Sequence, residues 1–155
     1  MVRFALEKDA DKILDLLRQV NQVHHSARPD IFKLGVKYDI VAVKELINNR
    51  QTPILVWVDE SDKVWGYCFC FLQNTAESAI LKGIKTLYID DLCVDETRRG
   101  QGIGTQLYNS ALALAKEKGC YNLTLNVWSC NPSALAFYRS LGLAEQKIYM
   151  EKVLV

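Results

Sequence analysis

The sequence has no excess of charge of either sign. Nineteen lysines and arginines stand against eighteen aspartates and glutamates, so the formal net charge is +1. Proteins that bind nucleic acid or anionic membranes usually carry a basic excess, and its absence argues against both kinds of partner. We therefore expect no nucleic acid and no membrane among the partners of this chain.

The spacings of a metal site or a disulfide framework are also missing. The five cysteines are odd in number and include no C-x-x-C pair, and the two histidines are neighbours, His24 and His25. Neither pattern matches zinc-ligand spacing. We expect no bound metal, and we expect reduced thiols in a protein of cytoplasmic localisation.

No apolar run is long enough for a membrane span. The most apolar stretch, residues 64–72, has roughly half the length needed, and the first ten residues lack the apolar core of a signal peptide. Hydrophobic residues nevertheless make up 50% of the chain, and no Pro-, Gly- or Ser-rich linker divides it. Residues 1–155 are therefore expected to form a single domain.

Apolar periodicity predicts a mixed sheet flanked by helices. Asp9 and Asp39 are expected to cap two helices, the first ending near His25. Further helices are expected after residues 103 and 131, because glycine or proline marks where each of them starts or ends. Strand-like runs are expected at 2–6, 53–58, 64–72, 86–94 and 121–127, with one or two more in the tail to residue 155. The order β-α-α-β-β-β-α-β-α-β indicates an α/β or α+β fold.

Three alternating glycines at the start of a helix form the most informative motif. Gly100, Gly102 and Gly104 follow Arg98 and Arg99, directly after an expected strand. Glycine lets the backbone approach a ligand closely, and free N–H groups at a helix N-terminus favour phosphate. An ordinary strand-to-helix turn would explain the same glycines without any ligand.

Two familiar phosphate-binding loops do not fit this turn. A Walker loop needs lysine after its last glycine, where the chain has Thr105. A dinucleotide fingerprint needs glycine at position 105 or 107, and position 107 is Leu107. A nucleotide-binding switch protein is therefore the weaker interpretation, and another phosphate compound is favoured.

The turn resembles the Arg/Gln-x-x-Gly-x-Gly/Ala signature of the GNAT superfamily of acetyl-CoA-dependent N-acetyltransferases. Here the signature reads Arg-Gly-Gln-Gly-Ile-Gly over residues 99–104. The segment from Asn131 to Tyr138 is similar to the family's second motif, Asn followed by Phe-Tyr and Leu-Gly, which ends here at Leu141-Gly142. The resemblance covers residues 86–143 closely. It implies a central mixed, mostly antiparallel sheet of six to seven strands, splayed into a V and flanked by about four helices.

By this resemblance the chain transfers an acetyl group from acetyl-CoA, the cosubstrate, to a primary amine by direct attack in a ternary complex. The turn would hold the pyrophosphate of coenzyme A, and the preceding strand would run beside the pantetheine arm. Asn131 is in addition a natural helix cap before Pro132. The residues implied in cofactor binding are Leu92, Cys93, Val94, Arg99, Gly100, Gln101, Gly102, Ile103, Gly104, Thr105, Asn126 and Asn131.

The resemblance also implies two catalytic residues, Tyr138 and Asp90. The family tyrosine protonates the leaving thiolate, although a core aromatic is the alternative role for Tyr138. Asp90 stands where related enzymes often carry glutamate. Because an ordinary Asp pKa near 3.9 is far below that of an amine, Asp90 would act through water or by orienting the ammonium. Asp91 is the alternative, since strand alternation would put the two carboxylates on opposite faces. A backbone N–H near Leu92 would meet the oxyanion.

The acceptor pocket is expected beside the segment that joins the first two helices, where family members often shape it. His25, Phe32, Tyr38 and Trp128 are the candidates to line it. The acceptor is a small-molecule or peptide amine whose identity stays open, and a homodimer through the C-terminal strands is a family-level expectation. A catalytically weak acyl-CoA-binding or regulatory domain of the same fold is the alternative function.

Overall fold

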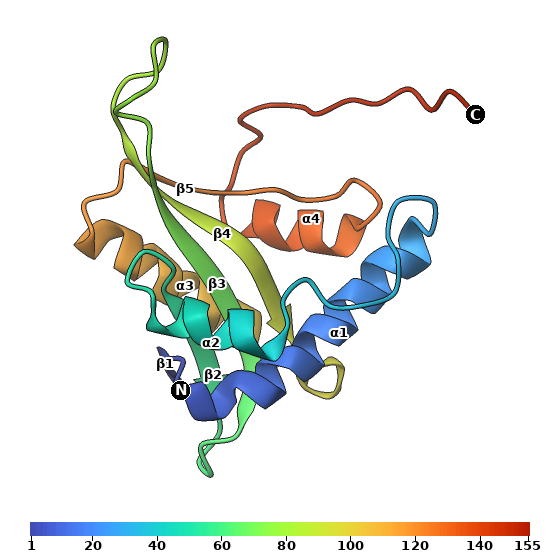
Figure 1. Ribbon diagram of the computed structural model, residues 1–155, viewed down its shortest axis with the longest axis vertical. Helices are drawn as coiled ribbons and strands as arrows, with labels where there is room; N and C mark the ends of the chain where they lie inside the picture. Colours follow the sequence, from blue (N-terminus) through green and yellow to red (C-terminus); the bar gives the residue numbers. More distant parts are fainter.

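The computed structural model describes residues 1–155 as a five-stranded sheet with helices on both faces (Figure 1). The strands lie side by side in chain order. All neighbours are antiparallel except the last pair, which is parallel. The expected mixed, mostly antiparallel sheet is thus confirmed, although it has five strands and not six or seven. The strands are β1 (Val2–Phe4), β2 (Ile54–Val58), β3 (Val64–Asn74), β4 (Lys85–Val94) and β5 (Asn122–Leu125).

Four α-helices accompany the sheet, in agreement with the expected number. They are α1 (Ala10–Ala27), α2 (Ile40–Asn48), α3 (Ile103–Glu117) and α4 (Pro132–Ser140), with single-turn 3-10 helices η1 (Glu7–Asp9) and η2 (Glu96–Arg98). None of the helices is both long and apolar enough to cross a membrane.

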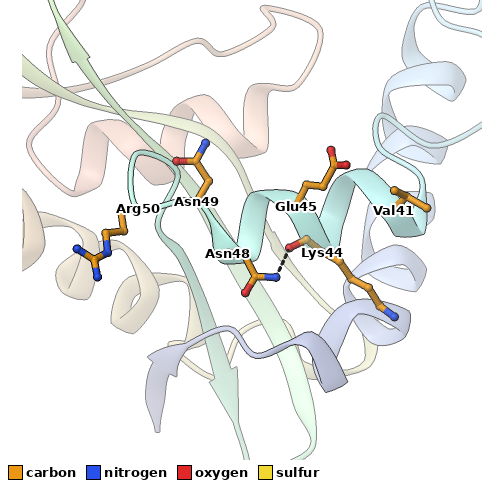
Figure 2. Close-up of a pocket in the computed structure, with 6 residues that line it drawn as sticks. All are labelled: Val41, Lys44, Glu45, Asn48, Asn49 and Arg50. Atoms are coloured by element: carbon orange, nitrogen blue, oxygen red, sulfur yellow. Dashed lines mark hydrogen bonds between the residues drawn. The ribbon is translucent and has the colours of Figure 1, made fainter.

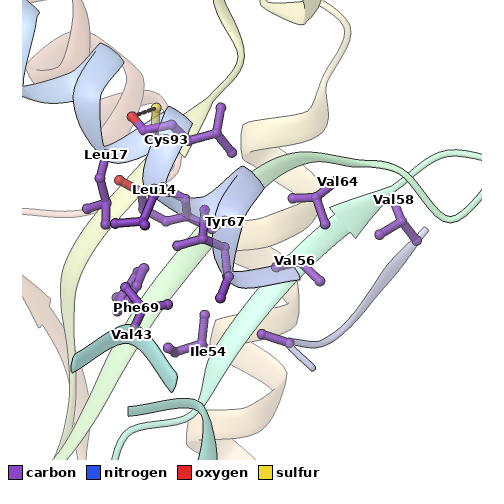
Figure 3. Close-up of a cluster of buried hydrophobic side chains, with 14 residues drawn as sticks. Leu14, Leu17, Val43, Ile54, Val56, Val58, Val64, Tyr67, Phe69 and Cys93 are labelled. Carbon is purple, nitrogen blue, oxygen red and sulfur yellow. Dashed lines mark hydrogen bonds between the residues drawn. The ribbon is translucent and has the colours of Figure 1, made fainter. Parts of the chain in front are cut away.

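The alternation of side chains along β2 and β3 builds two apolar layers. Val56, Tyr67 and Phe69 are buried on one face together with residues of α1 and α2 (Figure 3). Cys68 and Cys70, which alternate with them, are buried on the other face against α3. Because successive strand residues point to opposite faces, a mostly apolar strand such as β3 serves both layers at once.

The helix caps are only partly as expected. Asp39 caps α2, since its carboxylate accepts a hydrogen bond of 2.8 Å from the backbone N–H of Ala42. The predicted cap at Asp9 is wrong, because its carboxylate instead pairs with Arg3 at 2.7 Å and accepts the N–H of Leu6 at 2.8 Å. A 3-10 turn therefore precedes α1.

The C-terminal tail supplies no strand, which corrects the expected strand count. Residues 143–155 form no helix or strand, and the last residues run away from the body as extended chain (Figure 1). The apolar residues Ile148, Tyr149 and Met150 are consecutive and 76–98% exposed. Because they do not alternate with polar residues, they offer no single face to bury against the sheet. Near its start the tail is tied to α4 by an ion pair between Glu145 and Arg139, and farther along an ion pair of 2.6 Å joins Glu151 to Arg28.

The sheet opens between its two parallel strands. The pairing of β4 with β5 ends where Ile89 stands opposite Leu125. On its other side β4 stays paired with β3 as far as Val94. Residues 90–94 therefore have a strand on one side only, and their other edge has no strand partner.

Candidate active site

A β-bulge interrupts β4 at Asp90. Ile89 pairs with Cys70 of β3, and the next residue of β3, Phe69, pairs with Asp91. Asp90 is thus an extra residue with no partner of its own on β3. A bulge of this kind changes which face the following residues point to, because the alternation restarts after the extra residue.

The bulge brings both acidic side chains to the layer of α1 and α2. The Tyr67 hydroxyl, buried in that layer, donates a hydrogen bond of 2.7 Å to Asp91. The Tyr38 hydroxyl donates to Asp90 at 2.9 Å, and the Tyr38 ring stacks on Phe69 with 5.6 Å between centroids. The prediction that the two carboxylates lie on opposite faces is therefore wrong, since it assumed a regular strand.

The Asp90 carboxylate forms an ion pair that the sequence did not indicate. Lys37 Nζ lies 2.7 Å from each carboxylate oxygen. The Asp90 side chain is 12% exposed and that of Lys37 is 50% exposed, so the pair sits at an opening of the surface. A single lysine in a loop has no spacing that would mark it in advance. Burial, and then the hydrogen bond to Asp90, raises the pKa of Tyr38 well above its usual value.

Burial raises the pKa of Asp91 to about 6. The hydrogen bond from Tyr67 and the positive charge of Lys37 lower this pKa, and the negative charge of Asp90 raises it. A carboxylate with a pKa near neutrality accepts protons more effectively at physiological pH than an ordinary aspartate does. Asp91, the alternative to Asp90, therefore carries a carboxylate that can accept a proton near neutral pH.

Tyr138 lies on α4 beside Phe137, with 5.1 Å between the ring centroids. Its side chain is half-buried, and its hydroxyl makes no hydrogen bond within the protein while staying accessible to solvent. Burial raises the pKa of Tyr138 well above its usual value, and negative charge on Cys68 or Asp91 acts in the same direction. The phenol therefore keeps its proton at neutral pH.

The turn before α3 has free backbone donors. None of the N–H groups of residues 100–105 donates to an acceptor within the protein, and the first bond at this end of the helix runs from Gln106 N to Gly102 O at 3.0 Å. Gly100 and Gly102 have φ angles of 76° and 74°, in the left-handed region that favours glycine. The donors stand at the positive end of the helix dipole, which suits an anion.

The surroundings of the turn fit a pyrophosphate. A Cβ atom built on Gly100 or Gly102 would meet nothing within 4 Å, so the space above the turn is open. On the inner side, a Cβ on Gly104 would lie 3.3 Å from the Phe137 ring, which shows how closely α4 approaches α3. Arg99 is anchored by a hydrogen bond of 3.2 Å from its Nε to the carbonyl of Val94. Its cationic group therefore stays near the end of β4.

The cysteine on the free edge of β4 is not a nucleophile. The Cys93 thiol is buried and lies 3.6 Å from the carbonyl oxygen of Leu16 on α1 (Figure 3). Burial, with the nearby charge of Asp91, raises the pKa of Cys93 to about 12. Since the thiolate is the reactive form, this thiol stays protonated and inert at neutral pH.

The two candidate asparagines lie at and after the end of β5. Asn126 donates a hydrogen bond of 3.1 Å from Nδ2 to the Tyr88 hydroxyl. Asn131 caps α4, since its side-chain oxygen accepts the N–H of Ala134 at 3.2 Å. The structural role considered for Asn131 is thus present, and a second role toward a ligand stays a prediction.

An aromatic cluster joins the loop after α1 to the loop after β5. Phe32 meets Trp128 edge to face with 4.9 Å between centroids, and His24 stacks on Phe32, also at 4.9 Å. His24, and not the predicted His25, is the histidine of this cluster. Burial, followed by the charge of Lys37, lowers the pKa of His24, so it is neutral at physiological pH. Tyr38, the fourth candidate, lies at Asp90.

The surface has a further depression along α2 and the turn that follows it (Figure 2). It is lined by Val41, Lys44, Glu45, Asn48, Asn49 and Arg50, of which only Val41 is hydrophobic. None of these residues was a site candidate, and no hydrogen bond joins them to the bulge or to the glycine turn. The structure has no group of three or more His, Cys, Asp or Glu side chains that could hold a metal ion.

Known proteins resemble this chain in sequence and in structure. A family model described as acetyltransferase (GNAT) family matches residues 13–143. The chain is 34% identical over 68 residues to a probable glucosamine 6-phosphate N-acetyltransferase 2 of Oryza sativa subsp. japonica, a match that covers 44% of this chain and 39% of that protein. It is 36% identical over 145 residues to the thialysine N-epsilon-acetyltransferase of Mus musculus, covering 91% of this chain and 82% of that one.

A solved structure extends the similarity to the whole fold. A mutant of the BH1408 protein from Bacillus halodurans superposes with a TM-score of 0.95 at 34% sequence identity, covering 100% of this chain and 99% of that one. The match to the family model spans most of the sequence and includes β4, the glycine turn and α4. This chain therefore belongs to the GNAT family of acetyltransferases.

Proposed function

We propose that this chain transfers an acetyl group from acetyl-CoA to a primary amine, by direct attack of the amine within a ternary complex. Family membership supports the reaction class. The observation that carries the proposal is the turn at residues 100–105, whose backbone N–H groups are free and adjoin the unpaired end of β4. Such a turn suits a phosphate, and the free strand edge suits an extended chain attached to it.

The residues proposed to hold acetyl-CoA come from the unpaired end of β4, the turn before α3 and the segment after β5. The N–H groups of the turn, with Arg99, would bind the pyrophosphate. Leu92, Cys93 and Val94 would contact the pantetheine arm through their backbone, and Asn126 and Asn131 would contribute polar contacts from the other side. When bound, acetyl-CoA supplies an activated acyl group as a thioester.

The acidic pair at the bulge would prepare the acceptor. A lysine-like amine with a pKa near 10.4 is only about 0.1% neutral at pH 7.4, so its deprotonation costs roughly 4 kcal/mol. Asp90 would hold and orient the ammonium group. Asp91, with its pKa of about 6, would accept the proton through water.

Tyr138 would act as the general acid for the departing thiolate. Its phenol holds a proton at neutral pH because burial disfavours the phenolate. The same burial would also disfavour the coenzyme A thiolate beside Tyr138. Transfer of the proton from the Tyr138 oxygen to the sulfur would therefore neutralise a disfavoured thiolate and leave a disfavoured phenolate. A backbone N–H near Leu92, beside the bulge, would stabilise the oxyanion.

For the acceptor, only the chemical class is proposed. The relatives named above act on different amines, the ε-nitrogen of thialysine in one case and glucosamine 6-phosphate in the other. A primary amine of a small molecule or peptide is the proposal for this chain. A homodimer and a cytoplasmic location stay predictions.

The test measures thiol release from acetyl-CoA over a panel of amines, with mass spectrometry of the products. Release that depends on the amine and yields an N-acetylated product would support the proposal. Binding of coenzyme A without turnover of any amine would favour the catalytically weak binding domain. Thermal stabilisation by ATP or GTP, but not by coenzyme A, would overturn the proposed cosubstrate.

A further inference from the structure

The loop between α1 and α2 places a lysine on the carboxylate that is proposed to receive the acceptor. Lys37 Nζ contacts both oxygens of Asp90 at 2.7 Å. The Tyr38 hydroxyl occupies one further position on the same carboxylate, at 2.9 Å. A primary ammonium group on an unbranched chain of methylenes, which is what Lys37 is, therefore already fits this position.

The acidic pair at the bulge holds a single cation. Two adjacent carboxylates, Asp90 and Asp91, face the same layer, and Lys37 is the only basic side chain that hydrogen-bonds to either of them. Tyr67 and Tyr38 complete the contacts as neutral donors. Loss of the lysine would leave Asp90 without a positive partner, and a cationic ligand would restore the balance.

The lysine is held weakly enough to be displaced. The lysine side of the pair is 50% exposed and the Asp90 side is 12% exposed, and ion pairs that water reaches in this way are worth about 0.2–1 kcal/mol. Lys37 also lies in a loop and not within a helix or strand. Its side chain can therefore turn toward solvent without breaking a secondary-structure hydrogen bond.

We infer that Lys37 is an internal occupant of the acceptor position, and that the acceptor binds by displacing its ammonium group from Asp90. The acceptor would then be a primary ammonium carried on an unbranched alkyl chain, because that is the group which the position already accommodates. This inference rests on the proposed function. It predicts that removal of a lysine from the site improves binding of a positively charged ligand.

The experiment compares Lys37→Met, Lys37→Arg and Lys33→Met. Lys33 is an exposed lysine of the same loop without a hydrogen bond or ion pair, so Lys33→Met controls for the loss of one positive charge. The probe is Nα-acetyl-lysine methylamide, whose only charge is its ε-ammonium. Its Kd is measured by calorimetry with the protein saturated by coenzyme A, and its KM and kcat are measured with acetyl-CoA.

We expect Lys37→Met to lower Kd and KM by about 2- to 6-fold, because a ligand that must displace an internal competitor binds more weakly by that factor. The kcat should stay within about twofold of wild type, and Lys37→Arg and Lys33→Met should both keep the wild-type Kd. A Lys37→Met protein whose Kd is unchanged or higher would overturn the inference. So would an equal gain in Lys33→Met.

The two proposals fail in different ways. If the wild-type protein acetylates amines but Lys37→Met leaves Kd and KM unchanged, only the displacement is wrong. If no amine is acetylated, the proposed function is wrong, and the Kd still reports whether an ammonium competes with Lys37. As a check on the ligand, Nα-acetyl-norleucine methylamide, which has no amine, should show no gain with Lys37→Met.

Discussion

The ring of Phe32 meets the indole of Trp128 edge to face, with 4.9 Å between the ring centroids. Phe32 belongs to the loop after α1, and Trp128 belongs to the loop after β5. His24 stacks on the Phe32 ring. The contact joins two loops that are distant in the sequence and gives the proposed acceptor pocket an apolar wall.

Trp128→Ala should weaken acceptor binding selectively. Loss of the aromatic contact, worth about 0.5–1.5 kcal/mol, should raise the KM for the amine by roughly 2- to 12-fold. The KM for acetyl-CoA should change by less than about twofold. Steady-state kinetics with each substrate varied in turn would measure both. Tyr121→Ala, which removes a ring that is 78% exposed, is the control, and an unchanged amine KM in Trp128→Ala would contradict the pocket.

Tyr138→Phe should lower kcat by about 100-fold or more, which is the usual size of a general-acid contribution. The substitution removes only the hydroxyl, which makes no hydrogen bond within the protein, so the fold should keep its stability. The measurement is kcat over the pH range in which the protein stays folded. Tyr149→Phe, in the exposed tail, should behave as wild type. If Tyr138→Phe turns over at the wild-type rate throughout, another group supplies the proton.

Gly102→Ala should both destabilise the fold and impair coenzyme A binding, whereas Gly119→Ala should only destabilise it. Both glycines have positive φ angles, 74° and 67°, and open space where a Cβ would stand. Alanine in this conformation costs about 1–2 kcal/mol in each case. Only at Gly102 would the new Cβ enter the space above the free N–H groups.

Urea unfolding and calorimetry with coenzyme A separate the two effects. A weakening of coenzyme A binding by about tenfold or more is expected for Gly102→Ala, because charge-assisted contacts to the backbone are lost. Equal coenzyme A affinities in the two variants would place the pyrophosphate elsewhere.

Asp91→Asn should make the protein more stable at high pH. The folded-state pKa of Asp91, about 6, lies above the unfolded value near 3.9. The stability that this group contributes is therefore fully present below about pH 4 and is lost as the pH rises through 6. Asparagine resembles the protonated form, so the variant should gain as much as about 3 kcal/mol over wild type by pH 8.

Urea unfolding between pH 4 and pH 8 would measure this difference. The gap between Asp91→Asn and wild type should be small at the acid end and grow toward pH 8. Glu60→Gln, at an exposed position of the β2–β3 hairpin, should show no such growth. A constant gap across the range would mean that the Asp91 carboxyl has an ordinary pKa in the folded state.

The parts of the fold that depend on local patterns were predictable from the sequence. The order of helices and strands followed from apolar periodicity, and the cap at Asp39 followed from its residue type. The glycine turn was recognisable because positive φ angles at Gly100 and Gly102 demand that residue. Features that depend on pairing with another strand were harder to predict from the sequence. The tail was expected to form strands, yet its consecutive apolar residues have no neighbour to pair with.

The site residues that the sequence analysis missed come from long-range contacts. Lys37 and Tyr67 reach the acidic pair from a loop and from β3. Neither stands at a spacing that would relate it to Asp90 or Asp91. His24, and not the predicted His25, contacts Phe32. Because α1 continues to Ala27, the two histidines lie within its last turn and point in different directions, and only one of them can face Phe32. A helix boundary is the least certain part of a sequence-based assignment.

The extra residue at Asp90 places two consecutive acidic side chains on one face of β4. Ile89 and Asp91 pair with the consecutive residues Cys70 and Phe69 of β3, so they already point to opposite faces, as they would in a regular strand without Asp90. Deletion of Asp90 would therefore leave Asp91 and Cys93 on the layer of α1 and α2. It would remove one carboxylate, and with it the partner of Lys37. The bulge thus adds a second acidic side chain to the edge on which acetyl transfer is proposed to occur, where regular alternation supplies one.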